Sequence, residues 1–151
     1  MKLATALSER SDLQKRLTQL AVRLNNNAKV QEGDKPSENP KNLLAELDNI
    51  TSRLETLIAK INLANSTTVA DGKTLTEMMA QRDVLKTKNK VLRDFLDNAS
   101  YKVDRYSRSE IAVKSTVDVA ALQKTVDDTS KQLRLLDERI QELNWTTEIA
   151  D

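Results

Sequence analysis

Residues 43–64, LLAELDNITSRLETLIAKINLA, show most clearly the pattern from which the architecture follows. Apolar side chains recur there at alternating steps of four and three without a polar interruption: Leu43, Leu47, Ile50, Leu54, Leu57, Ile61 and Ala64. This period places them on one narrow stripe of an α-helix, which is typical of a helix that pairs with another helix. Asn39 and Pro40 supply an N-cap and a first helical position.

The same period occurs in three further segments, so the sequence predicts four helices, over residues 2–27, 40–65, 74–100 and 118–144. We expect the helices to be antiparallel. A turn at Asp71–Gly72 separates the second helix from the third, whereas the connections 28–39 and 101–117 are longer than a bundle requires. We predict a mainly all-α fold, a single domain spanning 1–151, in which the helices form two αα-hairpins. Alternating apolar residues at 111–117 further predict a short strand, paired with residues 28–30 in a two-stranded β ribbon at one end.

Composition argues against an enzyme. The 151 residues include no histidine and no cysteine, which removes the common general bases, thiol nucleophiles and zinc ligands. A Ser–Lys pair, or magnesium held by Asp127 and Asp128, remains as a route to catalysis. Adjacent helical carboxylates point about 100° apart, which disfavours a shared metal. We expect no catalytic residues, no cofactor and no metal.

The formal net charge of +1 gives no overall attraction to nucleic acid or membranes. No apolar run approaches the roughly 20 residues that a membrane helix needs, and charged residues interrupt the apolar patch near the amino terminus. We expect a protein of the cytoplasm with no membrane partner.

Three polar residues interrupt the predicted apolar stripes: Arg10 in the first helix, and Arg82 and Asn89 in the third. A buried guanidinium is tolerated only when it is paired and hydrogen-bonded, and acids on the other helices can supply the partner; the candidates are Glu46, Glu55, Asp137 and Glu142. A polar residue in such a stripe also fixes helix register. Anion binding by the two arginines is the alternative.

The segment DRYSRSE, residues 104–110, gathers cations and a tyrosine; with Lys102 the candidates for binding an anion are Lys102, Arg105, Tyr106 and Arg108. Such residues can hold phosphate and stack on a base. Ion pairs with Asp104 and Glu110 would instead make the segment a hinge. The single tryptophan, Trp145, is typical of a helix end or an interface.

Four stretches in this order, NNNAKVQEGD (25–34), DGKTLTEMMAQRDVLK (71–86), DRYSRSEI (104–111) and QELNWTTEI (141–149), resemble the septicolysin-like family of small, functionally uncharacterised bacterial proteins. The resemblance covers essentially the whole chain. It implies a small helical bacterial protein that self-associates, and it implies no reaction and no catalytic residues.

These observations lead us to expect a non-enzymatic helical scaffold or interaction protein. Narrow apolar stripes leave flanking apolar residues that need cover, and a homo-oligomer would provide it; these residues are Leu7, Leu44, Ile58, Phe95 and Leu135. The alternative is a module that binds a phosphate-bearing ligand or nucleic acid through residues 101–110.

Overall fold

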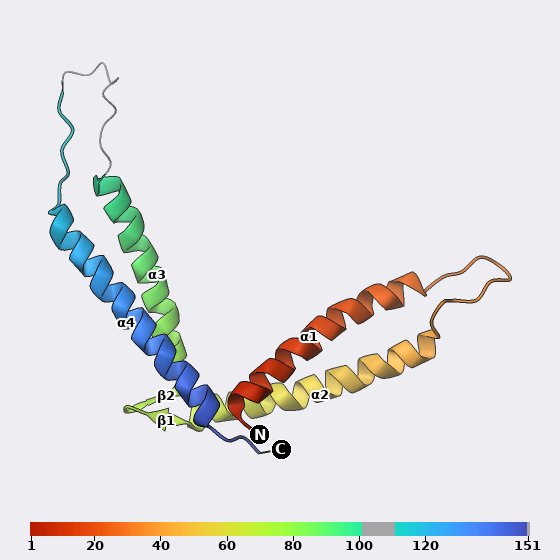
Figure 1. The fold of residues 1–151 in the computed structure, drawn as a ribbon. Coiled ribbons are helices and arrows are strands. Elements are labelled where there is room, and N and C mark those ends of the chain that lie inside the picture. Colours follow the sequence, from red (N-terminus) through yellow and green to blue (C-terminus); the bar gives the residue numbers. More distant parts are fainter. Residues whose placement is uncertain (101–110, 151) are drawn as a thin grey trace. The chain divides into compact units, whose positions relative to one another are not determined.

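The computed structural model describes residues 1–100 and 111–150. Its elements, in chain order, are α1 (Leu3–Asn26), α2 (Pro40–Thr67), β1 (Val69–Ala70), β2 (Lys73–Thr74), α3 (Leu75–Ser100) and α4 (Val119–Thr146) (Figure 1). Each helix begins and ends within two residues of its predicted bounds. The predicted fold class, mainly all-α with four long helices and a two-stranded ribbon, is confirmed.

The chain divides into two compact units: residues 1–75 together with residues from Glu142 on, and residues 76–141. The first unit contains α1, α2 and the ribbon. The second contains nearly all of α3 and most of α4. The prediction of a single domain stays a prediction.

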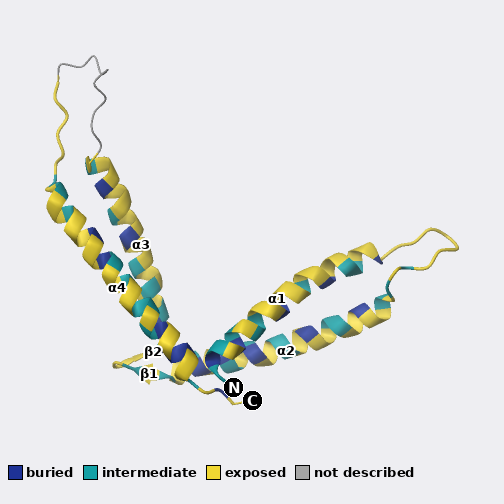
Figure 2. Ribbon diagram, viewed as in Figure 1, coloured by how far each residue is buried: buried dark blue, intermediate teal, exposed yellow. Residues whose placement is uncertain are grey.

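The first unit is an α1–α2 hairpin whose core is the predicted apolar stripe. Its fully buried residues include Leu3 and Leu20 of α1 and Leu57 and Ile61 of α2. Burying one such side chain stabilises a fold by about 1.5–3 kcal/mol. Figure 2 shows buried residues at intervals along α1 and α2, with exposed residues between them. Leu75 completes this core.

Polar side chains fix the ends of these helices. Asn39 caps α2, since its Oδ1 accepts a hydrogen bond of 3.0 Å from the Lys41 backbone N–H, and Pro40 follows at the first helical position. At the end of α1, the buried Asn27 donates to the Arg23 carbonyl and accepts from the Glu38 backbone N–H. The loop between α1 and α2 is therefore tied back to the helix.

The two ends of the described chain meet in the first unit, in a contact that we call the terminal clasp. The Leu3 N–H donates to the Thr147 carbonyl at 2.9 Å, and the Ile149 N–H donates to the Met1 carbonyl at 2.8 Å. An ion pair of 2.6 Å joins Lys2 to Glu148. Because Ile149 is also buried, the segment after α4 is part of the core.

The predicted strand at 111–117 was wrong, and so was its pairing with residues 28–30. Neither segment is a strand, and Ile111 and Val113 are exposed, because no apolar surface covers one side of the alternating residues. The ribbon lies instead at β1 and β2, where Val69 pairs with Thr74 and Ala70 with Lys73. Its turn is Asp71–Gly72, both at positive φ, which is the backbone that a two-residue hairpin requires.

The second unit is the α3–α4 hairpin, and its core is smaller. The buried apolar residues between 76 and 141 are Met78 and Leu96 of α3 and Val126 and Ile140 of α4. Two polar residues, Asn89 and Thr129, are buried among them. Asp118 caps α4 by accepting a hydrogen bond of 3.1 Å from the Ala121 backbone N–H.

Candidate functional surfaces

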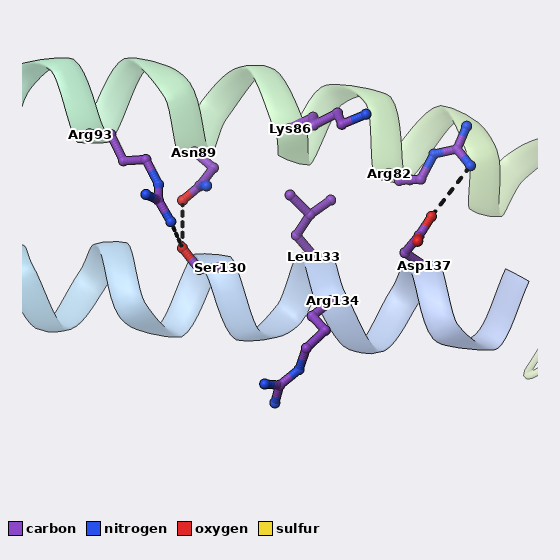
Figure 3. A pocket seen from close by; sticks show the side chains of 8 residues that line it. All are labelled: Arg82, Lys86, Asn89, Arg93, Ser130, Leu133, Arg134 and Asp137. Carbon is purple, nitrogen blue, oxygen red and sulfur yellow. Dashed lines mark hydrogen bonds and ion pairs between the residues drawn. The ribbon is translucent and has the colours of Figure 1, made fainter. Parts of the chain in front are cut away.

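A polar groove lies between α3 and α4, within the second unit (Figure 3). It has a volume of about 320 Å³ and is lined by Arg82, Lys86, Asn89 and Arg93 of α3 and by Ser130, Leu133, Arg134 and Asp137 of α4. The α3 residues follow one another at steps of four, three and four, so they form a single row along the helix. At 1.5 Å per residue this row is about 16 Å long.

A hydrogen-bonded cluster occupies one end of the groove. Arg93 Nη2 donates to the Ser130 hydroxyl at 3.0 Å. The hydroxyl lies 3.1 Å from Asn89 Oδ1 and 2.8 Å from the Val126 carbonyl, and it can donate its one proton to either acceptor. The Asn89 Nδ2 amide has no hydrogen-bond partner in the described part of the chain, although this side chain is only 8% exposed. The Asn89 amide can therefore donate a hydrogen bond to a ligand in the groove.

The charges of the groove are strongly unbalanced. Four cations line it against one carboxylate, Asp137, which lies 3.6 Å from Arg82 Nη1. Arg82 also contacts Asp83 at 3.1 Å. Lys86 has no acidic partner among residues 1–100 and 111–150, and Arg93 has none there either. Arg134 is directed away from α3 in Figure 3 and lies 3.9 Å from Glu138. Lys86 and Arg93 are thus the two cations of the row that form no ion pair in the described residues.

A second feature of α3 is an exposed apolar stripe, defined by Val84, Val91 and Phe95. Their side chains are 70%, 61% and 46% exposed, and steps of seven and four place them on one side of the helix. On the helical wheel this stripe is well over 90° from the groove row. The groove and the apolar stripe are therefore separate surfaces of one helix.

The other residues singled out in the sequence are not brought together. Arg10 is half-buried in the α1–α2 hairpin, and no acid of the described chain pairs with it. Trp145, in the last turn of α4, is 64% exposed, so its ring does not seal the helix end within this chain. Lys102, Arg105, Tyr106 and Arg108 lie outside the described residues.

The strongest ion pairs belong to the first unit and are structural. Arg53 holds Glu9 through two hydrogen bonds of 2.6 and 2.8 Å, which lower the pKa of Glu9. A hydrogen bond from Arg23, at 2.6 Å, lowers the pKa of Glu38 and raises the pKa of the arginine. These pairs join α1 to α2 and to the loop before α2.

The described residues offer no centre for metal chemistry and no membrane helix. No group of three Asp or Glu side chains in residues 1–100 and 111–150 could hold a metal ion. Over the same residues, no helix has the length and apolar character needed to cross a membrane.

Both surfaces carry a signal in the sequence that is weak by itself. Arg82 and Asn89 stand out because they interrupt an apolar stripe, but Lys86 and Arg93 resemble ordinary surface cations until α4 is placed beside them. Val84, Val91 and Phe95 become visible when the third helix is searched for a second row after the first has been assigned.

The fold and these surfaces define a small protein of two helical hairpins. Residues 10–149 match a family described as a family of unknown function, DUF6847, and the chain belongs to that family. A crystal structure of a functionally unknown conserved protein from Corynebacterium diphtheriae is similar to it, with 42% sequence identity and a TM-score of 0.86 over 99% of both chains. None of the curated proteins matches the chain. The resemblance to septicolysin-like proteins stays a prediction.

Proposed function

We propose that this protein is a non-enzymatic helical scaffold of the cytoplasm that binds a second copy of itself through α3. The observation that supports the proposal most directly is the exposed apolar stripe of Val84, Val91 and Phe95. Apolar side chains in one row at helical spacing are the surface that helices use to pair. The stripe is also narrow enough for one partner helix to cover.

The residues of α3 fit an antiparallel pairing of two copies. With Val84 beside Val91 of the second copy, the same register sets the small Ala80 opposite the large Phe95 of that copy. A two-fold axis repeats both contacts, because in such an interface each residue pair occurs twice. Large side chains facing small ones allow the two helices to approach closely.

Charge on the flank of the stripe favours the same register. Asp83 and Lys90 are seven residues apart and lie on the same side of the stripe, with opposite charges. Antiparallel helices bring matching flanks together, so Asp83 of each copy lies near Lys90 of the other. The two-fold axis then gives two ion pairs of opposite sign rather than two like-charge contacts.

The mass in solution tests the proposal. Sedimentation equilibrium should give about twice the 17.0 kDa chain mass at micromolar concentration. The double variant Val84→Glu with Val91→Glu should give the single-chain mass, and because Glu favours helices more than Val does, α3 should persist. Val22→Glu with Leu63→Glu is the matched control, since both side chains are more than half-exposed and belong to the first unit. A single-chain mass for the unmodified protein, or equal effects of both double variants, would contradict the proposal.

Charge reversal tests the register. Lys90→Asp sets two acids against each other at each contact and should weaken the dimer. Adding Asp83→Lys to the same chain should restore it, because each contact again joins opposite charges. A combined variant that remains as weak as Lys90→Asp would rule out this register.

A second candidate function is binding of an anion or nucleic acid by residues 101–110. Lys86 and Arg93 of α3, the helix that precedes this segment in the chain, favour this function because they carry the same positive charge as Lys102, Arg105 and Arg108. Replacing both Arg105 and Arg108 by Ala should lower the salt slope of nucleic-acid binding by about two, if each arginine contacts one phosphate. Binding with an unchanged slope in this variant would remove the segment as a site.

A further inference from the structure

We propose that the groove between α3 and α4 is a binding site for an anion that carries two or more phosphate groups. The starting observation is the row of Arg82, Lys86, Asn89 and Arg93 on one side of α3. Its cations are spaced along about 16 Å of helix, so one phosphate cannot contact them all. A ligand with several phosphate groups can.

The contacts already made in the groove show which groups are free to bind. Arg82 is engaged by Asp137 and Asp83, and its side chain is only 24% exposed. Lys86 and Arg93 form no ion pair within the described residues, although Arg93 also lines a neighbouring pocket with Asp97 and Asp127. The Ser130 hydroxyl accepts a hydrogen bond from Arg93 and so holds one end of the guanidinium in place. The other N–H groups of Arg93 can still donate to a ligand. Arginine held in this way is well suited to phosphate oxygens.

Asn89 is the observation that distinguishes a built site from surface charge. Its side chain is more than nine-tenths buried and lines the groove, and its Oδ1 is within hydrogen-bond distance of Ser130. Nδ2 is left without a partner within the described chain. No buried side-chain nitrogen or oxygen of the described residues lacks a partner, so Nδ2 is open to the groove, where it can donate to a phosphate oxygen between Lys86 and Arg93.

The lining also indicates what the groove does not recognise. No aromatic side chain lines it, so it offers no surface on which a base can stack. Its volume of about 320 Å³ is at the lower end of the range for small-molecule sites. These features favour recognition of phosphate groups themselves, whether they belong to a small polyphosphate or to the backbone of a nucleic acid.

Calorimetric titration with inorganic tripolyphosphate at low salt tests the site. The unmodified protein should bind with saturation at one ligand per chain. Lys86→Gln with Arg93→Gln should weaken binding by at least about tenfold, since both changes remove charge-assisted hydrogen bonds. The matched control is Lys124→Gln with Lys131→Gln, which removes two exposed cations of α4 that do not line the groove. This control should change the affinity by less than about threefold.

Asn89→Leu provides the second variant, because it leaves every charge in place. We expect it to weaken tripolyphosphate binding severalfold while the circular dichroism spectrum stays helical. No saturable binding by the unmodified protein, equal losses in both double variants, or full affinity in Asn89→Leu would overturn the proposal. The apolar stripe is not altered by these variants, so the chain mass tests self-association separately.

A single-stranded oligonucleotide distinguishes the two sources of phosphate. Saturable binding of tripolyphosphate together with weak oligonucleotide binding assigns the site to a small polyphosphate. If both bind and both are weakened by Lys86→Gln with Arg93→Gln, the groove accepts phosphate groups of a nucleic-acid backbone as well. If only the double variant Arg105→Ala with Arg108→Ala weakens oligonucleotide binding, residues 101–110 are the site and the groove is not.

Discussion

At the scale of single residues, three carboxylates of the first unit couple its stability to pH. Glu9, Glu38 and Glu148 each accept a hydrogen bond from a cation, respectively Arg53, Arg23 and Lys2. In the folded protein, each contact lowers the pKa of the glutamate below its ordinary value of 4.5. A carboxylate with a lowered pKa stabilises the fold above its unfolded pKa, and this contribution is lost as the pH falls through the folded pKa.

We therefore expect the melting temperature to change little between pH 7 and pH 5 and to decrease below about pH 4.5. Glu9→Gln should lower stability by no more than about 1 kcal/mol at pH 7, because the pair is largely solvated. The same variant should lose less stability between pH 5 and pH 3 than the unmodified protein does. Thermal unfolding followed by circular dichroism measures both effects. If both proteins lose the same stability between pH 5 and pH 3, Glu9 does not contribute to the acid sensitivity.

Residue-level prediction from the sequence succeeded where the cause is local. The cap at Asn39 follows from a short polar side chain just before an apolar period, and it accepts the expected backbone hydrogen bond. Partners across helices are harder to predict. The Arg82–Asp137 contact depends on the register of two helices, and Arg10, which occupies a similar place in its own stripe, forms no ion pair in the described chain.

At the scale of elements, the ribbon depends on its two-residue turn. Asp71 has φ of 54° and Gly72 has φ of 77°, so both are in the left-handed region. A Cβ added at Gly72 would meet no atom within 4 Å, so substitution there introduces backbone strain without a clash. We expect Gly72→Ala to cost about 1 kcal/mol of unfolding free energy in chemical denaturation.

Asp71→Asn is the control for this prediction. Asn adopts positive φ more readily than most residues, and Asn-Gly is a preferred pair in such turns. Asp71→Asn should therefore lower stability less than Gly72→Ala does, although Asp71 has an interaction of its own. Gly72→Ala without measurable loss would show that the turn relaxes to another backbone conformation.

The helices could be predicted from sequence and the strands could not, for the same physical reason. A stripe of seven or eight residues repeats the helical period often enough to be recognised, and every predicted stripe residue is buried or half-buried in the structure. The strands contain two residues each, too few for any alternation. The Asp71–Gly72 turn was the available signal, whereas the alternation at 111–117 predicted a strand that has nothing to pack on.

At the scale of the whole molecule, the two units differ in how much apolar surface they bury. The first unit contains most of the fully buried leucines and isoleucines, and the second has four buried apolar residues, with Asn89 and Thr129 among them. Local opening costs less where fewer apolar contacts are lost. We expect backbone amides of α3 and α4 to exchange with deuterium at least about tenfold faster than those of α1 and α2.

Hydrogen exchange of Leu57→Ala supplies the comparison. Removing this fully buried side chain should cost about 2–5 kcal/mol, so protection of α1 and α2 should decrease toward that of α3 and α4. Slower exchange in the second unit of the unmodified protein would show that its polar groove is more rigid than its small core implies.

The terminal clasp has a consequence for biosynthesis. Residues 1–75 are synthesised before residues 76–141, and the segment Glu142–Ile149, which completes the first unit, is synthesised only after both. At about 5–20 residues per second, the gap lasts roughly 3–13 s. During that time the Leu3 N–H lacks its acceptor, the Thr147 carbonyl, and the buried side chain of Ile149 is absent from the core of the first unit. On a polysome, the tail of a neighbouring nascent chain can occupy that place first, giving an exchanged pair of chains.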